Sequence, residues 1–216
     1  MNKSILILSG PTHEYIDPVR FIGNSSSGQM GKAIAEKAAE EGYIVTFVTG
    51  PVADANLPNL GKSGSIHSVI SAEEMLSKAS DFFSTSDIII FTAAVADYAP
   101  ANKLAEKMTK SEKDLVLKLR PTPDIAKMLC AKKRTDQIAI GFALQTSEGK
   151  KNARCKLVRK NLDGIVLNTP ASLGAETGTF SFLSSSAEEF NEWGRITKKE
   201  CALNIFQTLE NLTHGK

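Results

Sequence analysis

Short apolar runs alternate with amphipathic stretches along most of the chain. The apolar runs, which predict buried strands, are residues 5–8, 43–48, 88–91, 138–142 and 164–167. The stretches with apolar residues at helical spacing are residues 28–41, 71–83, 124–132, 150–162 and 198–209. This alternation predicts the α/β class, with a Rossmann-like, doubly wound and mostly parallel sheet. We expect one domain over residues 1–216, because the length suits one domain and no low-complexity linker divides the chain.

Turn residues mark the ends of the first strand–helix–strand unit. Residues 9–12 stop the first strand, because they neither continue a strand nor begin a helix directly. Residues 25–27 are serines whose hydroxyls are expected to cap the following helix, and Gly42 suits the position just after its end. The next strand should then lie parallel to the first, through a right-handed crossover.

A lysine-rich segment interrupts this rhythm between Tyr98 and Arg120. Residues 115–120 within it alternate between apolar and polar side chains, which is typical of a strand. We interpret residues 99–120 as an arm with an extra strand that leaves the main sheet and serves as a flap or a subunit-pairing element. A solvated surface hairpin explains the same spacing equally well.

Composition restricts the kind of partner. The net charge of +2, from 26 basic and 24 acidic residues, argues against broad electrostatic binding to nucleic acid or to a membrane. Cys130, Cys155 and Cys201 form no disulfide framework or zinc motif, so reduced thiols are expected. No apolar run approaches the ~18 residues of a membrane span, and the first residues do not resemble a signal peptide. We expect a cytoplasmic protein that binds small molecules.

Glycines and serines gather in the loops after the first strand and before the first helix. Ligands of open parallel sheets bind beyond the carboxyl ends of the strands. Gly10 and residues 25–31 offer backbone N–H groups, hydroxyls and a helix N terminus to a phosphate. The motif is neither GxGxxG nor GxxxxGK[ST], and serine–glycine turns are often helix caps, so phosphate binding and simple capping are about equally favoured.

Two later segments carry candidate nucleotide-binding residues. Residues 92–98 are mostly small, and Asp97 is a candidate acceptor for a ribose or a base, although a helix-capping aspartate in a tight turn explains the same pattern. Lys156 and Lys160 lie one helical turn apart, and paired lysines neutralise a triphosphate and a departing pyrophosphate. A solvated lysine face is the common alternative.

The sequence lacks the patterns of two other enzyme classes. The three histidines are isolated and no serine occupies a GxSxG motif, which disfavours hydrolase chemistry. An NAD(P)-dependent short-chain oxidoreductase would share the first strand, loop and helix, but it requires a Tyr-x-x-x-Lys pair. Neither Tyr15 nor Tyr98 provides that pair, because Val19 and Asn102 stand four positions later.

Several sequence blocks, taken together, point to one family. They are GPTHE at 10–14 with IDPVRFI at 16–22, Asn24 with SSG at 26–28 and MG at 30–31, AAVADY at 93–98, PDI at 123–125, GFA at 141–143 and KLVRKNLD at 156–163. In this order they resemble the phosphopantothenate-cysteine ligase family, the ligase half of the bifunctional bacterial coenzyme A biosynthesis protein. The blocks cover nearly the whole chain, and the first and third are highly specific.

The resemblance implies amide formation in coenzyme A biosynthesis. The 4′-phosphopantothenate carboxylate would attack the α-phosphate of CTP in the presence of Mg²⁺, and the amine of L-cysteine would then displace CMP from the acyl-cytidylate. CTP is favoured and ATP is the alternative cosubstrate. The resemblance also implies a homodimer whose interface lies at the arm. A separate phosphopantothenoylcysteine decarboxylase is expected, because the sequence begins at the ligase part.

The family pattern assigns roles to individual residues. Asn24 and Lys107 are the implied catalytic residues, and the amide N–H of Asn24 is expected to stabilise oxygen charge during attack by cysteine. The implied nucleotide-binding residues are Ala93, Asp97, Lys107, Thr122, Pro123, Asp124, Ile125, Phe142, Lys156 and Lys160. The residues expected to bind phosphopantothenate are Gly10, Ser26, Ser27, Gly28 and Gly31. Metal ligands are not assigned.

Three positions depart from the family pattern. Pro11 stands where the family usually has a second glycine, which removes an N–H donor from the first loop. Thr109 replaces one lysine of the arm, and Gln145 replaces a common glutamate. These departures keep open an alternative function, that of a catalytically silent, nucleotide-binding regulatory protein.

Overall fold

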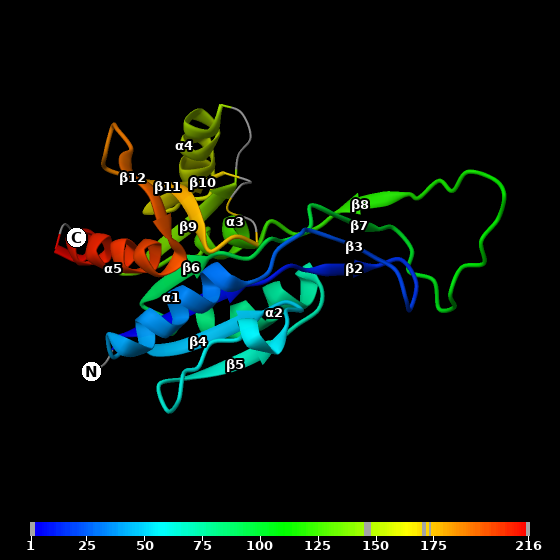
Figure 1. Cartoon of the computed structure of the whole chain (residues 1–216), viewed down its shortest axis with the longest axis horizontal. Helices are drawn as coiled ribbons and strands as arrows, with labels where there is room; N and C mark the ends of the chain where they lie inside the picture. The colour runs from blue at the N-terminus through cyan, green and yellow to red at the C-terminus, as the bar shows by residue number, and fades with distance from the viewer. Residues whose placement is uncertain (1–2, 145–147, 170–171, 173, 215–216) are drawn as a thin grey trace.

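The computed structural model describes residues 3–144, 148–169, 172 and 174–214. An eight-stranded sheet forms the centre of the protein (Figure 1). Its strands are β1 (Ser4–Ser9), β4 (Ile44–Thr49), β5 (Gly64–Ser68), β6 (Ile88–Phe91), β9 (Ile138–Leu144), β10 (Gly164–Asn168), β11 (Thr177–Ser184) and β12 (Asn191–Thr197). The neighbours from β5 to β10 are parallel, and β11 and β12 pair antiparallel. The predicted mostly parallel α/β fold is confirmed.

The strand order determines where a ligand is expected. The order is β12-β11-β10-β9-β6-β1-β4-β5, so the chain runs outward from β1 through β4 to β5 and then returns to β6 on the other side of β1. Strand order therefore reverses between β1 and β6. In open α/β sheets the crevice beyond the carboxyl ends of two such strands is the usual ligand site.

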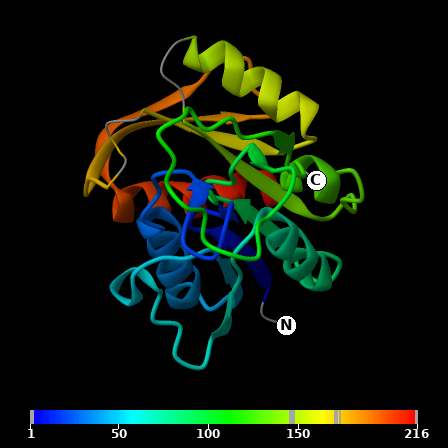
Figure 2. The ribbon, with the colours of Figure 1, turned by 90° about the vertical axis from the view of Figure 1, so that its right-hand side faces the viewer.

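Helices cover both faces of the sheet (Figure 2). They are α1 (Gln29–Glu40), α2 (Ala72–Phe83), α3 (Ile125–Cys130), α4 (Gly149–Arg159) and α5 (Lys198–His214), with a short 3₁₀ helix at Asp54–Asn56. The side chains of Ile5 and Ile7 enter a core shared with α1 and α5, whereas Leu6 and Leu8 enter a core shared with α2, α3 and α4. This alternation follows from the two-residue period of a strand, and it makes both faces of β1 apolar.

The helix ends agree only in part with the caps predicted from the sequence. The hydroxyl of Ser71 accepts a hydrogen bond from the N–H of Glu74 and caps α2. Gly42 has the left-handed φ of +81° expected just after a helix. The expected serine cap of α1 is wrong, because Gly28, with φ of +75°, occupies the N-cap position and no side chain in the described part of the chain caps this helix.

Two small hairpins extend away from the main sheet (Figure 1). In one, β2 (His13–Tyr15) pairs with β3 (Phe21–Gly23), and in the other β7 (Tyr98–Pro100) pairs with β8 (Leu119–Pro121). The second hairpin contains the segment predicted as an arm, residues 99–120, and its strand β8 begins only at Leu119. Residues 115–118 lie in the exposed loop between β7 and β8, where no strand is assigned.

Two further observations bear on the sequence-based expectations. None of the described helices has the length and apolar character needed to cross a membrane. All three cysteines are free thiols. Burial raises the pKa of Cys130 to about 12, so this thiol is not activated at neutral pH.

Candidate functional site

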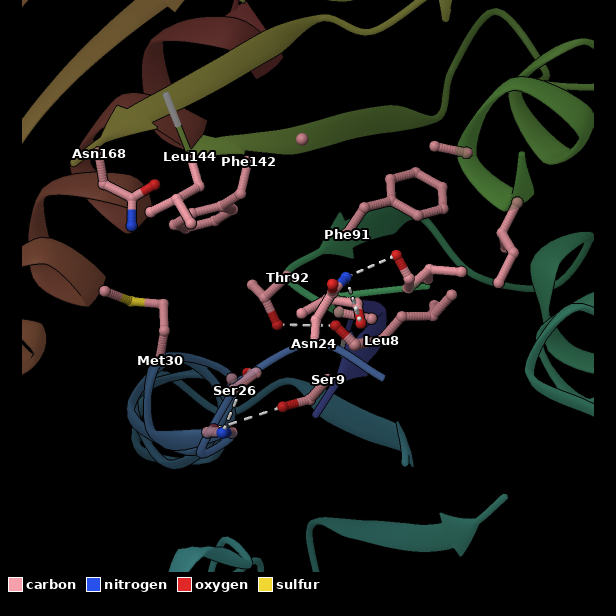
Figure 3. Close-up of a pocket in the computed structure, with 18 of the residues that line it drawn as sticks. Leu8, Ser9, Asn24, Ser26, Met30, Phe91, Thr92, Phe142, Leu144 and Asn168 are labelled. Atoms are coloured by element: carbon pink, nitrogen blue, oxygen red, sulfur yellow. Dashed lines mark hydrogen bonds between the residues drawn. The ribbon is translucent and has the colours of Figure 1, made fainter. Parts of the chain in front are cut away.

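A cavity of about 610 Å³ opens where the strand order reverses, beyond the carboxyl ends of β1 and β6 (Figure 3). Its walls come from loops that are far apart in the sequence, as the strand order requires. The predicted site residues that line it are Asn24, Ser26, Ser27, Gly28, Gly31, Ala93, Asp97, Thr122, Pro123, Asp124, Ile125, Phe142, Lys156 and Lys160. The volume lies within the usual range for small-molecule sites.

Two predicted site residues do not line this cavity. Gly10 has φ of +71°, and a Cβ atom there would lie 3.1 Å from the carbonyl oxygen of Gly50, so the glycine is needed for the turn that ends β1. Its carbonyl oxygen accepts a hydrogen bond from the N–H of Ala94 at 2.9 Å. Lys107 is exposed on the arm and is not among the residues that line the cavity of its own chain. The expected direct contacts of both residues are therefore absent from the cavity of a single described chain.

The start of α1 is suited to an anion. Gly28 leaves the N terminus without a side-chain cap, so the first N–H groups of the helix are available to a ligand at the cavity wall. Gly31 lets the helix pack closely on β1, since a Cβ atom at this position would lie 2.1 Å from the Oγ of Ser9. The two glycines thus bring a positive helix end against the carboxyl end of β1.

Asn24 links this helix entrance to the loop at residues 93–97 (Figure 3). Its Nδ2 atom lies 3.3 Å from the carbonyl oxygen of Ala94 and 2.9 Å from that of Val95. Both partners are acceptors, so the nitrogen of the amide must face them. In the structure the N–H groups of this amide are therefore engaged by the loop, and Oδ1 is the remaining polar atom of the side chain.

Basic side chains from α4 form another wall. The Nζ atom of Lys160 lies 2.6 Å from Oδ1 of Asp124, which also caps α3. Burial acts to raise the pKa of Asp124, but the hydrogen bond from Lys160 and the N–H of Lys127 outweigh it and lower the pKa.

Lys156 differs from Lys160 in having no ion-pair partner among the described residues. Burial, and then the neighbouring charge of Lys160, lower its pKa. Lys156 therefore presents an ammonium group whose desolvation a bound phosphate would compensate.

Several lining residues were missed by the sequence analysis, among them Asn168, Ser172 and Lys198. Asn168 ends β10, so the rule that ligands bind at the carboxyl ends of strands would have found it. No sequence pattern marked Lys198 as a site residue. Its Nζ atom lies 3.1 Å from Oε1 of Gln29 and 3.2 Å from the carbonyl oxygen of Ser172, so it joins the start of α5 to the start of α1.

The base of the arm is fixed to the β2–β3 hairpin. Asp17 is 0% exposed and accepts hydrogen bonds from the N–H of Met108 at 3.2 Å and from Nη1 of Arg20 at 2.5 Å. The same Nη1 donates to the carbonyl oxygen of Met108 at 3.2 Å. Asp17 and Arg20 therefore hold both backbone groups of the residue that follows Lys107.

The three departures from the family pattern lie outside the cavity wall or outside the described residues. Pro11 is buried and forms a parallel bridge with Ala94, and Thr109 is exposed on the arm. Neither lines the cavity. Gln145 lies outside the described residues.

Potential metal ligands are sparse in the structure. In the parts of the chain that the structure describes, no group of three or more histidine, cysteine, aspartate or glutamate side chains is arranged to hold a metal ion. The carboxylates at the cavity wall are Asp97 and Asp124, and Asp124 is paired with Lys160. Asp97 is the lining carboxylate that has no salt bridge to a described residue.

Known proteins show the same sequence pattern and fold. Residues 1–212 match the model of the family described as DNA/pantothenate metabolism flavoprotein C-terminal domain. The chain is 37% identical over 215 residues to the coenzyme A biosynthesis bifunctional protein CoaBC of Bacillus subtilis (strain 168), covering 98% of this chain and 52% of that protein. It is 40% identical over 216 residues to a cysteine/cysteine sulfinic acid decarboxylase of an unknown prokaryotic organism, covering 98% of this chain and 59% of that protein.

A solved structure agrees with this relationship. The crystal structure of the C-terminal domain of a CoaBC protein superposes with a TM-score of 0.83 at 37% identity, covering 99% of this chain and 97% of that one. This chain spans between half and three fifths of the two curated relatives, and nearly all of the solved domain. The similarity therefore concerns one part of those longer proteins.

Proposed function

Because the chain belongs to the family of DNA/pantothenate metabolism flavoprotein C-terminal domains, we propose that it joins 4′-phosphopantothenate to L-cysteine in coenzyme A biosynthesis. A nucleoside triphosphate drives the reaction, with CTP favoured over ATP. The observation that carries the proposal is that one cavity has two features suited to anions, the uncapped N terminus of α1 and the lysines of α4. Asn24 links the helix entrance to the loop at residues 93–97.

In the first step, a carboxylate oxygen of phosphopantothenate bonds to the α-phosphorus of the nucleotide, and pyrophosphate leaves. Lys156 and Lys160 stand at the cavity wall to stabilise the charge that develops on the phosphate oxygens. Asp124 holds Lys160 there through the 2.6 Å ion pair. The other anion-binding feature, the N terminus of α1 at Gly28, is assigned to the phosphate of phosphopantothenate.

Mg²⁺ fits this site as a companion of the triphosphate. Mg²⁺ is commonly held by one or two carboxylates together with substrate phosphates and water, and it neutralises phosphate charge when bound. Asp97 is the lining carboxylate suited to this contact, because Asp124 is committed to Lys160.

In the second step, the amine nitrogen of cysteine bonds to the acyl carbon, and the C–O bond to the nucleotide phosphate breaks. The nucleoside monophosphate leaves with the electron pair, and the surplus proton of the amine passes to water. We assign Oδ1 of Asn24 to the incoming amine, because Nδ2 is held by the carbonyl groups of Ala94 and Val95. An amide oxygen accepts a hydrogen bond from an amine and orients its lone pair.

The exposed arm supports a homodimer in which Lys107 serves the partner's cavity. Lys107 does not line the cavity of its own chain, and Asp17 and Arg20 hold the next residue at the hairpin. Leu115 and Val116, adjacent in the loop between β7 and β8, are 64% and 90% exposed, and neighbouring exposed apolar side chains favour a covering surface. A second copy provides both the cover and a cavity for Lys107.

The decisive assay uses purified protein with Mg²⁺, 4′-phosphopantothenate and either CTP or ATP, with and without L-cysteine. Pyrophosphate release is followed with time, and mass spectrometry identifies the nucleotide product and the new amide. CMP together with the cysteine amide is the expected result. Formation of AMP would support the same reaction with ATP in place of CTP. A folded protein that is inactive with both nucleotides would favour the alternative of a catalytically silent, nucleotide-binding protein.

A further inference from the structure

The peptide groups of Ala96 are held at both ends by threonine hydroxyls from distant parts of the chain. The Oγ1 atom of Thr12 accepts a hydrogen bond from the N–H of Ala96 at 3.0 Å. The hydroxyl of Thr122 donates to the carbonyl oxygen of Ala96 at 2.5 Å. Thr12 is 0% exposed and does not line the cavity, whereas Thr122 is half-buried and does line it.

The two residues before Ala96 carry the carbonyl groups that hold Asn24. Nδ2 of Asn24 donates to Ala94 and to Val95, and the backbone N–H of Thr12 also donates to the carbonyl oxygen of Ala94 at 3.4 Å. A displacement of Ala96 would move these carbonyl groups, because adjacent peptide planes share a Cα atom. The position of the Asn24 amide therefore depends on a buried hydroxyl that has no direct access to the cavity.

We propose that Thr12 is a positioning residue for the amide-forming step, acting through Ala96 and the carbonyl groups of Ala94 and Val95 to hold Asn24. The inference rests on the proposed ligase function and adds a residue that this function did not assign. Thr12 takes part in no bond that forms or breaks. Its contribution is to keep Oδ1 of Asn24 directed at the amine while the carbon–nitrogen bond forms and the nucleoside monophosphate leaves.

The chemistry of the contact explains why a hydroxyl is needed. Valine has nearly the shape of threonine but offers no acceptor, so Thr12→Val leaves the buried N–H of Ala96 without its partner. The loop would then shift to recover a hydrogen bond. Thr12→Ser keeps the acceptor and removes one methyl group, so it separates the hydrogen bond from packing.

The test compares the two half-reactions in wild type, Thr12→Val and Thr12→Ser. The first is the burst of pyrophosphate on mixing enzyme, Mg²⁺, 4′-phosphopantothenate and nucleotide without cysteine, and the second is the rate of amide formation after cysteine is added. For Thr12→Val we expect amide formation to slow by about tenfold or more, the effect of a misplaced reacting group. The pyrophosphate burst should fall by a clearly smaller factor, through the shift of Asp97 on the same loop. Thr12→Ser should stay within about threefold of wild type in both steps.

A matched control removes a threonine hydroxyl elsewhere. The hydroxyl of Thr208 on α5 donates to the carbonyl oxygen of Asn204, and neither residue lines the cavity. Thr208→Val should leave the ratio of the two half-reactions unchanged. Should Thr12→Val fail to fold, Thr12→Cys provides a second variant of similar size with a weak acceptor, for which the same selective loss is expected.

The outcomes separate this inference from the proposed function. A wild-type protein that performs neither half-reaction would contradict the proposed function before any variant is measured. With an active wild type, the inference is overturned if Thr12→Val slows both half-reactions equally or neither, or if Thr12→Ser is as impaired as Thr12→Val. A selective loss of amide formation that serine restores supports it.

Discussion

The buried carboxylate of Asp17 accepts a hydrogen bond from the backbone N–H of Met108, 91 residues later in the chain, at 3.2 Å. The contact joins the β2–β3 hairpin to the base of the arm that carries Lys107. Burial acts to raise the pKa of Asp17, but hydrogen bonds from the N–H groups of Val19, Arg20 and Met108 and from the Arg20 side chain lower it to about 2. The ionised carboxylate is thus the form that holds the hairpin and the arm together.

The stability of the protein should depend on this carboxylate in acid. Because the pKa of Asp17 is about 2 in the folded state and ordinarily 3.8, its contribution is complete above pH 3.8 and is lost as the pH falls toward 2. Asp17→Asn should lower the urea midpoint at pH 6 and flatten its decline between pH 4 and pH 2. Equilibrium urea unfolding across this range measures both effects, and parallel curves for variant and wild type would contradict the assignment.

Nucleotide binding should depend strongly on Lys156. Loss of one charged contact to phosphate costs roughly 1.5–3 kcal/mol, so Lys156→Met should raise the KM for the nucleotide by about ten- to a hundredfold. Lys150→Met is the control, because Lys150 lies on the same helix, is paired with Glu192 and does not line the cavity. Steady-state kinetics with varied nucleotide measures the effect, and equal KM values for the two variants would remove Lys156 from the site.

The same lysine should give the nucleotide affinity a pH dependence. Burial and the charge of Lys160 lower the pKa of Lys156 below its ordinary value of 10.5, so its positive charge is lost earlier as the pH rises. The KM for the nucleotide should therefore rise on the alkaline side in wild type. If the KM of Lys156→Met rises equally on the alkaline side, the rise belongs to another titrating group.

The close packing of α1 on β1 should not tolerate a methyl group at Gly31. Alanine favours a helix by about 1 kcal/mol over glycine, but overpacking costs about 1–3 kcal/mol, and the added Cβ would lie 2.1 Å from Oγ of Ser9. Gly31→Ala should therefore lower the free energy of unfolding, and Ser9→Gly should be less harmful in combination with it than alone. Urea unfolding of the two single variants and the double variant forms the cycle, and simple additivity would show that the contact does not limit the packing.

Activity should be restored by mixing two inactive variants if Lys107 acts in the partner's cavity. Lys107→Ala and Asn24→Asp each impair every site in their own homodimers, but a mixed dimer would contain one cavity with Asn24 and the partner's intact lysine. An equal mixture with free exchange should recover about a quarter of the wild-type rate, because half of the dimers are mixed and one of their two sites is complete. Activity no greater than the sum of the separate variants, with mixed dimers shown to form, would place Lys107 in its own cavity or outside the reaction.

The order of strands and helices through the main sheet was determined by local sequence. Runs such as Ile88–Phe91 are apolar on consecutive residues because β6 is buried on both faces, and this pattern is visible without any structure. Three strands of the same sheet, β5, β11 and β12, escaped prediction. In β12 (Asn191–Thr197) the side chains are mostly exposed, since the strand lies at the sheet edge and pairs with β11 alone.

Candidate site residues could be found for a related reason. Asp97 and Phe142 lie at or after the carboxyl ends of predicted strands of the main sheet and belong to blocks with a family resemblance, and the parallel order brings them to one cavity. The sequence could not show which atom of Asn24 is free, because this depends on two carbonyl groups about 70 residues away.

The sequence by itself determined the alternation of elements and the chemical types gathered at the carboxyl ends of the strands, because both follow from short-range patterns of polarity. The tertiary structure alone decided that Gly10 and Lys107 do not line the cavity of their own chain and that Thr12 holds Ala96. Each of these depends on contacts between segments far apart in the chain, whose geometry is fixed only when the sheet and its two helical layers pack together.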